Sequence, residues 1–91
     1  MAIAVNFTPE SMNAEQYDEI IKSLDAAGAG APESRLYHAC FGSGDKLRVM
    51  DIWESGETFG QFAQTLVPIL HRVGLGDVQP EISPIYNTIK G

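Results

Sequence analysis

Three side chains in the middle of the chain are candidates to do chemistry together. His38 lies in the segment "RLYHACF", and Asp51 and Trp53 lie in the next segment, "KLRVMDIW". Histidine changes its charge near neutral pH, which makes His38 the best candidate for proton transfer. A carboxylate within an apolar strand is usually paired or used, so Asp51 is a candidate general base. Trp53 offers an aromatic wall suited to a flat organic ligand.

The same three residues also have purely structural interpretations. Trp53 would then be core packing whose indole N–H is satisfied locally. Asp51 would pair with Arg35 or accept backbone hydrogen bonds at a helix end. His38 would be a hydrogen-bonded structural residue. The sequence leaves these alternatives open.

The strand register decides whether the histidine can meet the aspartate. If Ser43 and Gly44 form a two-residue turn, the histidine lies opposite Val49 and shares a face with the aspartate and the tryptophan. A slip of one residue would place Tyr37 on that face instead, because side chains alternate along a strand. The sequence therefore predicts either His38 or Tyr37 beside the candidate base.

Other chemistries find little support in the sequence. His38 and Cys40 are two residues apart, as at the start of a metal site, but no second pair of ligands follows, so no metal is expected. A Ser–His–Asp hydrolase is not expected either, because there is no Gly-x-Ser-x-Gly elbow. The run "GAGAP" lacks the strand-to-helix context of a nucleotide loop, and no cofactor is expected.

Six elements must position these residues. The predicted order is a strand at 2–7, a helix at 13–28, strands at 35–41 and 46–53, a helix at 55–74 and a strand at 80–89. Asn13 and Gln16 can form a capping box for the first helix, and Ser55 can cap the second. Only "GSGD" separates the two middle strands, which predicts a tight antiparallel hairpin. Pro80 and Pro84 are an even number of residues apart, so both missing amide hydrogens lie along the same lateral edge of the last strand. That edge cannot pair fully with a neighbour, which marks an edge strand.

Both helices are amphipathic. Their apolar stripes are Tyr17, Ile20, Ile21 and Leu24 in the first helix and Phe59, Phe62, Ala63, Leu66, Leu70 and Val73 in the second. Pro68 lies well inside the second helix, where it removes the hydrogen bond to the Gln64 carbonyl and should kink or break the helix.

The βαββαβ order predicts the fold class. With short connections and right-handed crossovers, the common solution is an α+β, ferredoxin-like sandwich with a four-stranded antiparallel sheet and both helices on one face. We expect a single domain covering residues 1–91. The strands are apolar on both faces, so the face without helices should be an interaction surface. The economical answer is a two-fold homodimer, and the alternative is a binding groove open to solvent.

Composition narrows the range of partners. The chain has 44% hydrophobic and 20% charged residues, as in globular proteins, and a net charge of −6 with scattered basic residues. Binding to nucleic acid or to an anionic membrane would need clustered Lys and Arg, so neither is expected. Residues 1–7 lack the pattern of a secretion signal and Cys40 is the only cysteine, which predicts a cytoplasmic protein.

The segment "DIWESGETFGQF" resembles the antibiotic biosynthesis monooxygenases, a family of dimeric α+β barrels. The likeness rests on a Trp-Glu-Ser turn from the third strand into the second helix and on the aromatic four residues after the Ser. It implies two sheets packed face to face and a cavity in each subunit between sheet and helices. In the cofactor-independent, quinone-forming members, the position of Trp53 lines the cavity together with an Asn and a Tyr. Those two positions are Val49 and Phe59 here, so the hydrogen-bonding groups for a phenolic substrate are absent.

The haem-degrading branch of the same family is a poorer match. Its first-strand Asn is matched by Asn6, but Phe62 stands at the Trp position and His71 falls one residue from the His position. A helical residue displaced by one position points about 100° away. We do not predict haem degradation.

The sequence thus predicts a homodimeric barrel that binds a small apolar or aromatic molecule. The predicted ligand-binding residues are Trp53, Val49, Phe59 and Phe62, and the predicted acid–base residues are His38 and Asp51. If the protein is a cofactor-independent monooxygenase, the substrate carbanion itself must reduce O₂. The alternative is a non-catalytic dimeric domain whose cavity is filled by its own side chains, namely Phe59, Phe62, Leu66 and Trp53.

Overall fold

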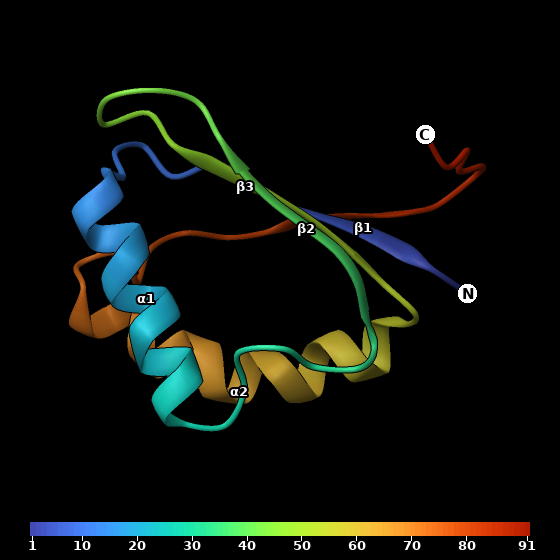
Figure 1. Ribbon diagram of the computed structural model, residues 1–91, viewed down its shortest axis with the longest axis horizontal. Helices are drawn as coiled ribbons and strands as arrows, with labels where there is room; N and C mark the ends of the chain where they lie inside the picture. Colours follow the sequence, from blue (N-terminus) through green and yellow to red (C-terminus); the bar gives the residue numbers. More distant parts are fainter.

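The computed structural model describes residues 1–91 and contains the six predicted elements in the predicted order (Figure 1). They are β1 (Ile3–Phe7), α1 (Ala14–Ala26), β2 (Arg35–Phe41), β3 (Arg48–Trp53), α2 (Gly56–Arg72) and β4 (Glu81–Pro84). The sheet has the order β2-β3-β1-β4, and every pair of neighbours is antiparallel. Figure 1 shows both helices on one face of the sheet. The predicted ferredoxin-like α+β fold is confirmed, and neither helix has the length and apolarity needed to cross a membrane.

The predicted helix caps are present. The Asn13 side chain accepts from the Gln16 amide at 2.8 Å, and the Gln16 side chain accepts from the Asn13 amide at 3.0 Å, which completes the capping box of α1. Ser55 Oγ accepts from the Thr58 amide at 3.2 Å at the start of α2. Each side chain satisfies an amide that has no partner within its helix. Local sequence therefore determines where both helices begin.

Pro68 does not interrupt α2, which runs continuously from Gly56 to Arg72. Of the two predicted outcomes, a kink or a break, the break does not occur. A proline removes one hydrogen bond, but the flanking residues Leu66, Ile69 and Leu70 are buried in the core. Their packing outweighs the loss of that single bond.

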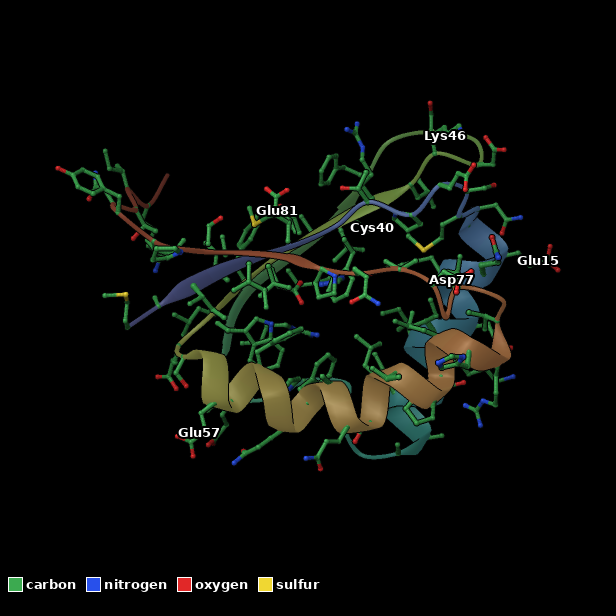
Figure 2. All side chains as sticks on the ribbon, turned by 180° about the vertical axis from the view of Figure 1, so that it is seen from behind. Glu15, Cys40, Lys46, Glu57, Asp77 and Glu81 are labelled. Carbon is green, nitrogen blue, oxygen red and sulfur yellow. The ribbon has the colours of Figure 1, made fainter.

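The core lies between the sheet and the helices. β1 contributes Ile3, Val5 and Phe7, and α2 contributes a matching stripe that includes Phe59 and Phe62. The side chains of the two layers fill the space between them, as Figure 2 shows from behind, and Glu57 points away from the core. Fifteen of the 91 residues are buried, so the core of a single chain is thin.

The hairpin between β2 and β3 is wider than predicted. Phe41 pairs with Arg48, so residues 42–47 form the connection and the predicted tight turn at "GSGD" is wrong. The reason is a contact from outside the hairpin. The Met12 amide donates to the Asp45 carbonyl at 2.7 Å, and the Leu47 amide donates to the Met12 carbonyl at 3.1 Å. The β1–α1 connection therefore holds residues that would otherwise extend β3.

Because the loop is wider, the pairing of β2 with β3 differs from the predicted register, but the same side chains face the helices. His38 lies opposite Asp51 instead of the predicted Val49, and Cys40 takes the place opposite Val49. The shift is two residues, and side chains alternate with a period of two, so the face on which each residue lies is unchanged. His38, and not Tyr37, lies on the helix-facing side with Asp51 and Trp53.

β4 lies at the edge of the sheet, as Pro80 and Pro84 predict, but it is shorter than the predicted strand at 80–89. Pro84 is already opposite Ile3, the first residue of β1. Only the hydrogen bond from the Ile85 amide to the Ala2 carbonyl, at 3.0 Å, extends the pairing. The residues after it have no strand to pair with.

The sheet face away from the helices is largely apolar. By strand alternation and register its apolar members are Ala4, Tyr37, Ala39, Phe41, Met50 and Ile52, and its polar members are Asn6, Arg48, Glu81 and Ser83. Tyr37 is 52% exposed and Phe41 44% exposed in the single chain. At the margin, Glu81 of β4 points away from the helices (Figure 2).

Candidate functional site

His38 and Asp51 meet directly across β2 and β3. They are cross-strand partners, and His38 Nδ1 lies 2.6 Å from Asp51 Oδ1. The Asp51 side chain is 4% exposed and the His38 side chain 23% exposed. The carboxylate is thus removed from water and the imidazole is not, so the pair presents the histidine toward the outside.

Trp53 completes the surroundings of the carboxylate. It lies two residues after Asp51 on the same face of β3, and its indole N–H donates to Asp51 Oδ2 at 3.3 Å. Both oxygens of the buried carboxylate therefore have a donor, and no buried side-chain polar atom lacks a partner. The suggested pairing of Asp51 with Arg35 does not occur, because the Arg35 guanidinium donates to the Gly30 carbonyl at 3.1 Å.

Tyr17 is the member of this group that the sequence did not identify. It reaches the sheet from α1, and its hydroxyl lies 2.6 Å from His38 Nε2. The two rings are nearly parallel, with centroids 6.0 Å apart and an angle of 11° between planes. The sequence placed Tyr17 on the core-facing stripe of its helix, which is correct. A buried tyrosine hydroxyl usually has a hydrogen-bond partner, so the sequence indicated that such a partner exists. Which residue it is depends on how α1 crosses the sheet.

The hydrogen bonds form one chain from Tyr17 to Asp51. A carboxylate accepts and does not donate, so the network assigns the proton to His38 Nδ1, which donates to Asp51. His38 Nε2 then accepts from the Tyr17 hydroxyl. A proton that leaves Tyr17 would arrive on His38, whose positive charge would lie against the carboxylate.

Burial raises the pKa of the Tyr17 phenol above its ordinary value of 10.0, and the charges of Cys40 and Asp51 raise it further while Arg35 lowers it. Tyr17 is therefore a hydroxyl donor at neutral pH. Burial also raises the pKa of the Cys40 thiol, with a further contribution from Asp18. A protonated thiol is a weak nucleophile and a poor metal ligand. No group of three or more His, Cys, Asp or Glu residues is placed to hold a metal ion.

A cavity of about 50 Å³ lies beside the hydrogen-bonded residues Tyr17, His38 and Asp51. It is bordered by α1, the sheet and α2 and is partly open to solvent. Its lining surface is almost entirely apolar, and the lining residues that carry polar groups are Tyr17, Arg35, His38 and Asp51. Of the predicted ligand-binding residues, Val49 and Phe62 line this cavity and Trp53 and Phe59 do not. The predicted acid–base residues both line it.

Trp53 lies behind the cavity wall. It is 1% exposed, and its ring centroid is 5.7 Å from that of Phe59 and 4.9 Å from that of Phe62. The indole fills the space between β3 and α2, and its N–H is satisfied two residues away. In this chain Trp53 has the geometry of the core-packing interpretation and does not form the expected aromatic wall.

The cavity is small compared with an aromatic molecule. An engineered cavity that binds benzene has about 150 Å³, three times the volume of about 50 Å³ found here. A ring can enter only with part of it in the open mouth or after lining side chains move.

The fold is shared with SnoaB, a cofactor-independent oxygenase from Streptomyces nogalater. The crystal structure of a SnoaB mutant gives a TM-score of 0.64 at 12% sequence identity, over 99% of this chain and 96% of that one. A second SnoaB crystal structure gives 0.61 at 14% identity over the same shares. No family model and no curated protein sequence matches the chain. The chain therefore has the fold of the antibiotic biosynthesis monooxygenases, as the Trp-Glu-Ser turn indicated, and at these identities the likeness concerns the fold alone.

Proposed function

We propose that the protein binds a small apolar or aromatic molecule at the cavity between α1 and the sheet and that the His38–Asp51 pair exchanges a proton with it. The observation that carries this proposal is the placement of the pair. A buried carboxylate orients a partly exposed imidazole at the edge of an otherwise apolar cavity. Apolar pockets with a few convergent polar groups are the usual form of small-molecule sites.

The pair has the parts needed for general base catalysis. A neutral histidine can accept a proton at physiological pH, and Asp51 both fixes the ring orientation and stabilises the imidazolium that forms. The burial of the Asp51 carboxylate strengthens this charge interaction. A ligand whose proton is acidic would therefore be ionised more readily at this site than in solution.

The oxygenase version of this function starts from a carbon acid. Proton removal from an activated CH₂ group leaves a carbanion, which transfers electrons to O₂ and forms a hydroperoxide. Loss of water then gives the ketone, so that R₂CH₂ and O₂ become R₂CO and H₂O. The fold shared with SnoaB, which is described as a cofactor-independent oxygenase, supports this version over other uses of a base.

We also infer that a second copy of the chain covers the open face of the sheet. The support is the apolar character of that face, including the exposed rings of Tyr37 and Phe41, and the thin core of the single chain. Arg48 lies over the Phe41 ring at 5.0 Å and would remain at the margin of such an interface. Burial of two such faces against each other would supply the missing apolar contacts.

A non-catalytic dimeric domain is the second candidate function. The cavity volume of about 50 Å³ and the complete burial of Trp53 favour it, because both show that side chains already occupy much of the interior. In that case the Tyr17–His38–Asp51 chain only joins α1 to the sheet.

Oxygen uptake separates these functions. An oxygen electrode would follow a panel of anthrones and hydroquinones with the wild type, His38→Gln and the matched control His71→Gln, in which the other, exposed histidine is replaced. We expect uptake by the wild type and the control, and a loss of about 100-fold or more in His38→Gln. A folded wild-type protein that consumes no oxygen with any compound would contradict the oxygenase function.

A further inference from the structure

Neither nitrogen of His38 is free to meet a ligand. Nδ1 is bound to Asp51 Oδ1 at 2.6 Å, and Nε2 is bound to the Tyr17 hydroxyl at 2.6 Å. A base needs an unoccupied lone pair within hydrogen-bond reach of the proton that it removes. The Tyr17 hydroxyl therefore occupies the position from which a ligand would approach the imidazole.

We propose that the ligand exchanges its proton with the Tyr17 hydroxyl. His38 accepts the tyrosine proton in turn, and Asp51 pairs with the imidazolium that forms. The inference rests on the proposed function and assigns the group that touches the ligand. Tyr17 becomes the catalytic residue in contact with the substrate, and His38 the acceptor of the tyrosine proton.

The proton transfers balance as a relay. The bond between the ligand and its acidic hydrogen breaks, and that hydrogen forms a new O–H bond with Tyr17. At the same time the original Tyr17 O–H bond breaks and its proton forms an N–H bond at His38 Nε2. The electron pair of the broken ligand bond stays on the ligand, which becomes an anion, and the imidazolium is paired with the Asp51 carboxylate. The return of both protons restores the starting state.

Tyr17 is held firmly in position for this role. Its backbone amide donates to the Asn13 carbonyl at 3.1 Å, in the first turn of α1 that the capping box stabilises. Its hydroxyl lies 2.6 Å from His38 Nε2, and its ring is nearly parallel to the imidazole, at 11°. A reacting group fixed by a helix and by a hydrogen bond needs little reorganisation.

The charges around the cavity suggest the class of ligand. Burial keeps the Tyr17 phenol protonated, so it cannot act as a base unless His38 takes its proton in the same step. Arg35 also lines the cavity, and its positive charge favours an anion near the Tyr17 hydroxyl. Its guanidinium is steadied by the Gly30 carbonyl and lies 5.9 Å from the centroid of the Phe62 ring. The site suits a carbon acid next to a carbonyl group, whose anion is an oxygen-centred enolate.

Solvent exchange under anaerobic conditions tests the relay without any oxygenation. Indan-2-one, a small aromatic ketone with acidic CH₂ groups, would be incubated in D₂O with each variant, and deuterium uptake would be followed by NMR. The variants are the wild type, Tyr17→Phe, His38→Gln, the double variant, and the control Tyr86→Phe at a fully exposed tyrosine. The phenylalanine keeps the ring and removes only the hydroxyl.

We expect Tyr17→Phe and His38→Gln each to lower the exchange rate at least tenfold, the double variant to lose no more than the worse single variant, and Tyr86→Phe to match the wild type. The dissociation constant of naphthalene, which has no acidic hydrogen, should stay within threefold in Tyr17→Phe. Exchange at the wild-type rate in Tyr17→Phe, together with loss in His38→Gln, would overturn the relay and leave the proposed function standing. Absence of exchange in the wild type would overturn both.

Discussion

His38 and Asp51 face each other across β2 and β3, with 2.6 Å between Nδ1 and Oδ1. The strand register differs by two residues from the one that a two-residue turn would give, so the partner of His38 is Asp51 and not Val49. It joins an imidazole to a buried carboxylate that has no other charged partner.

Asp51→Asn should impair both folding and proton transfer. The amide keeps the size of the carboxyl group, but one of its ends is a donor. It can accept from the Trp53 indole and donate to His38 Nδ1 only if the imidazole carries its proton on Nε2, which reverses the hydrogen bond to Tyr17 and replaces a charge-assisted bond by a neutral one. The expected cost is about 1–3 kcal/mol in the free energy of unfolding, measured by urea denaturation. Exchange of the indan-2-one protons should fall at least tenfold, and full stability with full exchange would contradict the role of the carboxylate.

Trp53→Phe should affect stability and spare ligand binding. The substitution removes the indole N–H that donates to Asp51 and leaves a gap against Phe59 and Phe62. We expect a loss of about 2–4 kcal/mol in the free energy of unfolding. The dissociation constant of indan-2-one should change by less than threefold, since Trp53 does not line the cavity. A large loss of affinity at nearly unchanged stability would show that the indole does contact the ligand.

The stability of the fold should decline at alkaline pH. The pKa of the Tyr17 phenol is raised above its ordinary 10.0 by burial, so the folded state binds the proton more tightly than the unfolded state. This contribution is fully present below pH 10.0 and is lost as the pH rises through the higher folded-state pKa. Unfolding by urea between pH 8 and 11 should therefore show a decline that is shallower in Tyr17→Phe than in the wild type. An equal decline in both proteins would show that Tyr17 does not contribute.

Phe41→Glu should dissociate the proposed dimer. The ring lies on the open sheet face and is 44% exposed in the single chain, so a carboxylate there would have to lose its hydration at the interface. Val67→Glu is the matched control, because Val67 is 46% exposed but lies on α2. Sedimentation should show a dimer for the wild type and the control at micromolar concentration and a monomer for Phe41→Glu. A monomeric wild type would refute the dimer.

The elements of the fold were predictable because their signals are local. The capping box at Asn13, the cap at Ser55 and the paired prolines of β4 each depend on residues a few positions apart. The hairpin register was not predictable, because Met12, more than thirty positions away in the chain, pairs with the backbone around Lys46. The continuity of α2 through Pro68 was not predictable either, because it depends on the packing of Leu66, Ile69 and Leu70 in the core.

The candidate site was predictable only in part. Strand alternation placed Asp51 and Trp53 on one face and left either His38 or Tyr37 to join them, and the structure places His38 there. The partnership of Tyr17 with His38 depends on the position of α1 over β2, which no sequence spacing specifies. Trp53 does not line the cavity because its indole fills the space between β3 and α2. The size of that space depends on the packing of all the side chains around it.

The central claim is that a ligand binds beside His38 and acts on its protonation. The chain has only two histidines, so their imidazole nitrogens can be assigned by comparing ¹⁵N-labelled wild type with His71→Gln. Addition of indan-2-one should shift the ¹⁵N signals of His38 in a saturable manner and leave those of His71 unchanged. Unshifted His38 signals at a concentration that saturates binding would contradict the account.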